Sequence, residues 1–239
     1  MAVARRSADA GSRSPAATSR GAVGRALESL TEKAYRQIEE LIVTLQIPPG
    51  AVVSEALLSE RLAIGRTPIR EALQRLARER LVVVLPRRGI MVSEINVRTQ
   101  LRLLEVRREL ERLIARSAAR RAGAAQREQF HAIAAAMEAA ARSNDDLAFM
   151  RSDRELNLLA LDAARNEFAT GAMALMHGLS RRFWYIHYKE VADMPLAARL
   201  HATLARAIAD GDGDQAAVAS DRLLDYIEDF TRATVTADA

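Results

Sequence analysis

The stretch GRTPIREALQRLARERLV, residues 65–82, decides the fold of the first part of this 239-residue chain. Its apolar residues recur at the i, i+3, i+4 and i+7 spacing of a helix that buries one face, at Ile69, Ala72, Leu73 and Leu76. The opposite face carries Arg66, Thr67, Arg70, Gln74 and Arg78. We expect Thr67 to be the N-cap and Pro68 the first helical residue, which fixes two arginines at the leading end of the helix. A surface helix with no binding role has the same pattern. The neighbouring segments must therefore decide whether this helix binds a partner.

The segments before this helix predict two further helices. A helix that starts at Thr31 is stopped by Pro48-Pro49-Gly50, and Ser54 caps a second, short helix, EALLSERLA. Three residues, 63–65, separate that short helix from the one above. Two short helices joined by so tight a turn are typical of a helix-turn-helix, whose second helix enters the major groove of DNA by its N-terminal end.

The segment that follows, LVVVLPRRGIMV (residues 81–92), predicts a β-hairpin. Its turn contains Arg87, Arg88 and Gly89, which a wing would place against the minor groove or the phosphate backbone. Residues 54–90 carry eight basic and four acidic side chains, and residues 1–26 carry five arginines and one aspartate. This concentration of positive charge favours a polyanionic partner. We expect residues 1–26 to be a disordered basic tail.

The residues LSERLAIGRTPIREALQRLARERLV, followed by PRRGI, resemble the winged-helix DNA-binding domain of the GntR family of bacterial transcription regulators. The resemblance implies base and phosphate contacts at Arg66 and Arg70, with Thr67 beside them and wing contacts at Arg88 and Gly89. An arginine bidentate to guanine discriminates bases, and we assign this role to Arg66 or Arg70, with Gln74 on the same face. Arg61 and Arg87 are expected to contact phosphates, which carry affinity but little sequence information.

From Asn96 onward the sequence predicts six amphipathic helices and no strand, at residues 97–123, 126–142, 144–163, 166–190, 195–210 and 213–236. The expected fold is therefore mainly α: a winged helix-turn-helix at residues 27–95, then an all-α antiparallel bundle at residues 96–239. The order of LLEVRRELERLIARSAARRA, a helix containing Asp153, and ARLHATLARAIADGD resembles the C-terminal domain of the FadR-like (FCD) subfamily of GntR regulators, in its shorter six-helix variant.

The FCD resemblance implies a homodimer and a small-molecule pocket, often for a carboxylate, and in many members a divalent metal held by one Asp and three His. The matching positions here are Asp153, Asn157, His201 and Leu223. Only Asp153 and His201 of this degenerate set remain strong ligands, so we expect no tightly held metal unless His187 substitutes. We expect an organic-acid effector to bind directly, with Arg107 and either Arg181 or Arg182 as carboxylate partners. Further hydrogen bonds would come from Asp153, Asn157, Tyr185 and His201.

Three classes of function are open at this stage. The first is a cytoplasmic, dimeric regulator, expected to be a repressor, that binds a pseudo-palindromic operator and responds to a metabolite. The second is an effector-independent repressor or architectural DNA-binding protein. The third, an enzyme, is disfavoured because the chain has no cysteine, no clustered histidine motif and no glycine-rich phosphate loop. No secretory signal or membrane-length apolar run is expected either.

Overall fold

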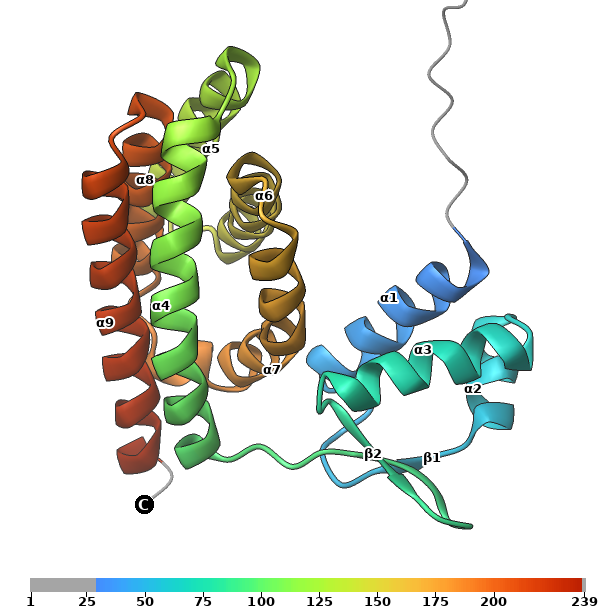
Figure 1. Cartoon of the computed structure of the whole chain (residues 1–239). Helices are drawn as coiled ribbons and strands as arrows, with labels where there is room; N and C mark the ends of the chain where they lie inside the picture. The colour runs from blue at the N-terminus through green and yellow to red at the C-terminus, as the bar shows by residue number, and fades with distance from the viewer. Residues whose placement is uncertain (1–28, 238–239) are drawn as a thin grey trace, which may run out of the picture.

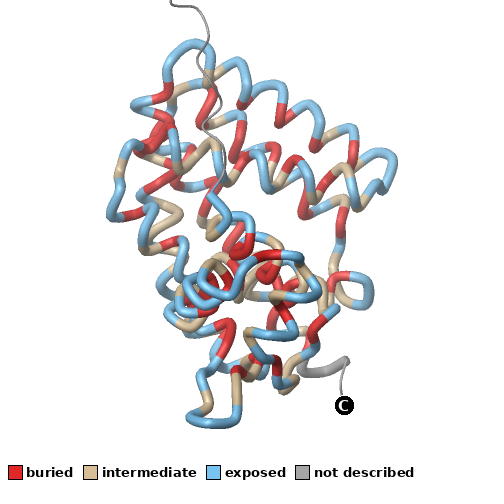
Figure 2. Tube along the Cα trace, turned by 90° about the vertical axis from the view of Figure 1, so that its right-hand side faces the viewer, coloured by how far each residue is buried: buried red, intermediate tan, exposed pale blue. Residues whose placement is uncertain are grey.

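A computed structural model describes residues 29–237 of the chain. Within this part, nine helices and three short strands form an N-terminal lobe and a larger helical bundle (Figure 1). The expected basic tail, residues 1–26, lies outside the described residues. Figure 2 shows that buried positions recur along the inner sides of the helices in both parts, as the apolar stripes predict.

The N-terminal lobe is a winged helix-turn-helix. Its elements are α1 (Leu30–Val43), β1 (Val52–Val53), α2 (Glu55–Leu62), α3 (Arg66–Arg78), β2 (Val82–Leu85) and β3 (Gly89–Val92). The strands pair antiparallel in the order β1-β3-β2, with Val52 opposite Met91 and Leu85 opposite Gly89. The predicted hairpin is therefore confirmed, and β1 adds a third strand to it.

The start of α3 differs from the sequence prediction. Gly65 is the N-cap, no side chain caps the helix, and Pro68 is the third helical residue rather than the first. Ile64, just before the cap, and Ile69, in the first turn, are both buried in the core of the lobe. This spacing is that of a hydrophobic staple, which fixes the entry of the chain without a hydroxyl cap. The apolar stripe itself is buried as predicted.

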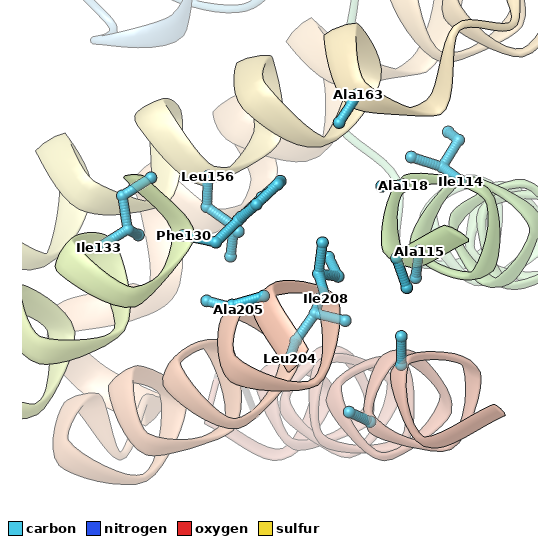
Figure 3. Packing of buried hydrophobic residues seen from close by; sticks show 14 of the residues in the cluster. Ile114, Ala115, Ala118, Phe130, Ile133, Leu156, Ala163, Leu204, Ala205 and Ile208 are labelled. Atoms are coloured by element: carbon cyan, nitrogen blue, oxygen red, sulfur yellow. The ribbon is translucent and has the colours of Figure 1, made fainter. Parts of the chain in front are cut away.

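The second part is a bundle of six helices, whose ends lie within two residues of the predicted ones. They are α4 (Val97–Arg121), α5 (Ala124–Ser143), α6 (Asp146–Ala164), α7 (Glu167–Val191), α8 (Met194–Asp210) and α9 (Gly213–Ala237). Helix α5 packs along α8, and α4 along α9. Phe130, Ile133, Leu156 and Ile208 meet in their core, and small alanines such as Ala118 let the helices approach closely (Figure 3).

The two parts meet where α1 packs against α7. Figure 1 shows α7 on the side of the bundle that faces the N-terminal lobe, and the chain passes from β3 to α4 along the same edge. None of the helices in the described part of the chain combines the length and hydrophobicity needed to cross a membrane.

Candidate functional site

The face of α3 that carries the predicted DNA contacts is open to solvent. Arg66, Thr67, Arg70 and Gln74 are all exposed, as is Arg61 on α2. Figure 1 shows that α2 and the tip of the β2–β3 hairpin lie on the side of the molecule away from the bundle. Nothing in the bundle therefore obstructs the approach of a duplex to this side.

The wing places two of its three predicted contact residues in solvent. Arg87 and Arg88 are exposed in the turn between β2 and β3. Gly89 has a structural reason to be glycine, because its φ is +104° and a Cβ there would lie 2.9 Å from the carbonyl oxygen of Val53. Gly89 thus allows the turn end of the hairpin to pack against β1, and its contact with DNA stays a prediction.

Arg70 is paired within the lobe, which the sequence analysis did not anticipate. Its Nε and one terminal nitrogen donate to the two carboxylate oxygens of Glu55, at 2.9 and 2.8 Å. This contact lowers the pKa of Glu55, the first residue of α2. The fork holds Arg70 in one direction, so a base or phosphate would have to share it with Glu55. Arg66 forms no such fork with the described side chains, although its charge also contributes to lowering the pKa of Glu55.

A cavity of about 370 Å³, within the size range of small-molecule sites, lies in the bundle and reaches the end of α1 in the N-terminal lobe. Its walls come from α4, α6, α7, α8 and α9 of the bundle and from the end of α1. All six predicted effector-binding residues line it: Arg107, Asp153, Asn157, Arg181, Tyr185 and His201. The fold therefore brings together residues that lie up to 94 positions apart, although Tyr185 is only partly inside.

Three of these residues form a hydrogen-bonded group on α6 and α8. The Asn157 amide donates to Asp153 Oδ1 at 2.9 Å, and His201 Nε2 lies 3.2 Å from the same oxygen. His201 Nδ1 lies 2.7 Å from the carbonyl oxygen of Ala197. Both ring nitrogens therefore face acceptors. Burial opposes the charged form of each group, but the contact between them outweighs it, so the pKa of His201 is raised and that of Asp153 is lowered.

The group does not provide the ligand set of a metal site. Asp153 and His201 contact each other, the Asn157 amide is turned to Asp153 through its nitrogen, and the fourth position is the hydrocarbon of Leu223. No cluster of three or more His, Cys, Asp or Glu residues with ligating geometry occurs among residues 29–237. Structural and catalytic zinc sites need three or four such ligands, so the residues present do not fit the metal that the family resemblance implies.

Two substitutions are expected to rebuild a metal site. Asn157→His combined with Leu223→His would add two imidazoles to the wall that already holds Asp153 and His201. We expect the double variant to bind zinc at least about tenfold more tightly than the wild type in a chelator competition, since two ligands become four. Leu223→His alone is the matched control and should gain much less. Equal zinc affinity in all three proteins would contradict this account of the cavity wall.

His177 also lines the cavity, and the sequence analysis did not single it out. It lies on α7, one turn before Arg181, and its charge would interact with Asp153. Burial lowers its pKa to about 4, an effect strengthened by Arg181 and Arg107 and opposed by Asp153. His177 is therefore a neutral imidazole at neutral pH, able to both donate and accept a hydrogen bond inside the cavity.

The lowered pKa of His177 predicts a loss of stability in mild acid. As the pH falls from about 6.5, the unfolded chain binds this proton first, because the folded-state pKa is only about 4. The stabilisation is present above pH 6.5 and is lost between pH 6.5 and 4, by roughly 3 kcal/mol for a shift of this size. Urea unfolding across this range should show the loss, and His177→Gln should flatten it. A variant with an unchanged pH profile would rule His177 out as its source.

Of the two alternative carboxylate partners, Arg181 lines the cavity and Arg182 does not, and the position of His187 does not support a role as a metal ligand. Arg182 points out of the cavity into the junction of the two parts, where it donates to the carbonyl oxygen of Ser93 at 2.9 Å and to Ser93 Oγ at 3.0 Å. His187 packs on Phe183, with ring centroids 4.8 Å apart, and is not among the cavity-lining residues. Because successive residues on a helix point 100° apart, Arg181 and Arg182 face different surroundings.

Comparison with known proteins agrees with both parts of the fold. Residues 18–92 match the model of the family described as bacterial regulatory proteins, gntR family, and residues 102–226, more than half of the chain, match the FCD domain. The HTH-type transcriptional repressor RspR of Escherichia coli is 26% identical over 209 residues, covering 86% of this chain and 90% of that protein. A regulator from Streptomyces ambofaciens is 40% identical over 62 residues, 26% of each chain.

Solved structures show the same architecture. The structure titled E. coli McbR/YncC superposes with a TM-score of 0.75 at 17% identity, covering 87% of this chain and 100% of the other. A putative GntR regulator from Rhodococcus sp. RHA1 superposes with a TM-score of 0.61 at 17% identity, over 87% of this chain and 98% of the other. Members of this family regulate transcription and are not enzymes. The chain belongs to the GntR family of bacterial transcription regulators, with a DNA-binding winged helix-turn-helix followed by an FCD domain.

Proposed function

We propose that this regulator is a homodimeric repressor whose operator affinity is set by a small organic acid in the cavity of the FCD domain. Residues 27–95 form the DNA-binding unit, and residues 96–239 form the effector-binding and dimerisation unit. The protein acts in the cytoplasm, where residues 1–26 add phosphate contacts. The repressor role is proposed by analogy with the E. coli relative RspR, a transcriptional repressor by name. A two-fold dimer requires an operator with matching symmetry.

The observation that carries this proposal is the double role of α7. One side of the helix lines the cavity with His177, Arg181 and Trp184. Another side holds the DNA-binding domain: Gly178 lets Leu81 approach so closely that a Cβ would lie 2.6 Å from it, and Arg182 binds Ser93. A ligand that moves α7 must therefore also change how the DNA-binding domain is held.

The chemistry of the cavity favours a carboxylate over an apolar ligand. Three arginines reach its wall besides Arg107, namely Arg151, Arg154 and Arg181, alongside two partly buried histidines, His177 and His201. The aromatic side chains of Phe149, Trp184 and Phe230 form an apolar part against which a hydrocarbon body would pack. Charged arginines with an adjacent aromatic surface suit an anion that carries a small organic body.

Two measurements test the proposal together. Native mass spectrometry of the untagged protein should show a dimer, with any retained ligand as added mass. Fluorescence anisotropy should then show that a carboxylate, but not its uncharged amide, changes affinity for an operator selected from random duplexes by the protein itself. A monomer would contradict paired binding of two half-sites. A dimer whose operator affinity no organic acid changes would support the alternative, an effector-independent repressor.

A further inference from the structure

Arg181 is the cavity residue whose partners lie in the other domain. One terminal nitrogen donates to Glu39 Oε1 at 3.1 Å, and the other donates to Glu40 Oε2 at 3.3 Å, both on α1. The same guanidinium lines the cavity. Arg181 therefore stands between the ligand site and the DNA-binding domain.

Two other basic side chains of the wall, Arg107 and His201, have partners within the FCD domain. Arg107 donates to Glu111, four residues along α4, at 2.6 Å, and His201 contacts Asp153. A ligand carboxylate that takes Arg107 or His201 rearranges contacts within the bundle alone. A ligand carboxylate that binds Arg181 instead removes the cation that pairs with Glu39 and Glu40 on α1.

Loss of the contact with Arg181 should be costly for Glu39, because this carboxylate is buried, with 9% of the residue exposed. Burial raises the pKa of both Tyr35 and Glu79, and the negative charge of Glu39 adds to this effect, so the three groups lie close enough to repel further negative charge. Tyr35 donates to Glu79 at 2.9 Å in the same small network. Without Arg181, Glu39 would be a buried and unpaired negative charge near Glu79. Separation of α1 from α7 would expose this carboxylate to water and would therefore become more favourable.

We propose that the carboxylate of the effector displaces Glu39 and Glu40 from Arg181, so that ligand binding and docking of the DNA-binding domain compete for one guanidinium. This inference rests on the proposed function of the cavity and adds a route by which its occupancy reaches α1. Because coupling is reciprocal, whatever weakens docking must strengthen ligand binding by the same factor.

The only tryptophan of the chain, Trp184, lines the cavity and gives a built-in fluorescence probe. The test titrates succinate, citrate and benzoate, with their amides as uncharged controls, and follows hydrogen exchange of α1 in the same samples. In the wild type, a binding carboxylate should speed exchange at residues 36–44. In the double variant Glu39→Gln, Glu40→Gln it should bind about threefold to tenfold more tightly, since Arg181 is already free, and should no longer change exchange in α1.

Two further variants complete the comparison. Arg181→Gln should bind the carboxylate at least about tenfold more weakly, with fast exchange in α1 from the start. Glu111→Gln frees an arginine of the same cavity without touching α1, so it should keep the ligand-dependent exchange of the wild type.

The possible failures are distinguishable. If no carboxylate changes Trp184 fluorescence in the wild type, the proposed organic-acid site is wrong and the exchange mechanism falls with it. If a carboxylate binds the wild type but Glu39→Gln, Glu40→Gln binds it unchanged, the site stands and the competition for Arg181 is refuted. A ligand-independent exchange rate in α1 of the wild type would refute the competition in the same way.

Discussion

Arg66→Ala is expected to remove most of the preference of the protein for its operator over a scrambled duplex. Arg66 is exposed at the first position of α3 and, unlike Arg70, does not donate a two-atom fork to a carboxylate among the described residues. A bidentate contact from arginine to guanine contributes about 1–3 kcal/mol of discrimination, so the affinity ratio should fall by roughly 5-fold to 150-fold. Anisotropy titrations on both duplexes at one salt concentration measure this ratio.

Arg87→Ala is the matched control, because Arg87 is equally exposed but lies in the hairpin turn. Loss of a phosphate contact there should weaken binding to both duplexes by the same factor and make the affinity less dependent on salt. If Arg66→Ala also weakens both duplexes by the same factor, Arg66 contacts the backbone, and base recognition has to be assigned to Arg70 or Gln74.

The second large effect is expected for Arg182→Ala. Arg182 is 1% exposed, and three hydrogen bonds join it to the segment between β3 and α4: two to Ser93 and one, of 3.4 Å, to the Glu94 carbonyl oxygen. Ser93 Oγ donates in turn to the carbonyl oxygen of Arg80 at 2.8 Å. Truncation leaves a void and an unpaired carbonyl group, which together should lower the free energy of unfolding by about 3 kcal/mol.

Arg182→Met separates the contribution of side-chain volume from that of the hydrogen bonds. Methionine fills most of the volume and removes the buried charge, whose burial lowers the pKa of Arg182 to about 10. We expect a loss of about 1 kcal/mol from the unpaired Ser93 carbonyl group, partly offset by relief of the desolvated charge. Urea unfolding followed by circular dichroism compares the three proteins. Wild-type stability in Arg182→Ala would show that its hydrogen bonds contribute nothing to the junction.

The helices and the wing were predictable because their signals are local. An apolar stripe, a break at Pro48–Gly50 and a basic turn at Arg87 each lie within a few residues, and short-range backbone preferences act over that distance. The start of α3 was misplaced for a related reason. Thr67 has a good capping side chain, but packing of Ile64 and Ile69 decided the helix entry instead.

The contacts of the cavity were only partly predictable. Arg107 and Glu111 are four residues apart, so the pairing could be suggested from sequence. Arg181 and its partners on α1 are 141 and 142 residues apart, and no local pattern connects them. His177 was missed because the family pattern directs attention to positions 153, 157, 201 and 223, whereas the turn of α7 that delivers His177 is set by tertiary packing.

The tight approach of Leu81 to Gly178 limits how this regulator could be rebuilt from parts. A chimera that fused its first 95 residues to the FCD domain of a distant relative would place an unmatched helix opposite Leu81, Glu39 and Ser93. A Cβ at position 178 would lie 2.6 Å from Leu81 Cδ1, so the buried Leu81 would have to move, and the contacts of Arg181 and Arg182 would be lost. A chimeric sensor with a new specificity therefore requires that Gly178, Arg181 and Arg182 be transferred together with the DNA-binding domain.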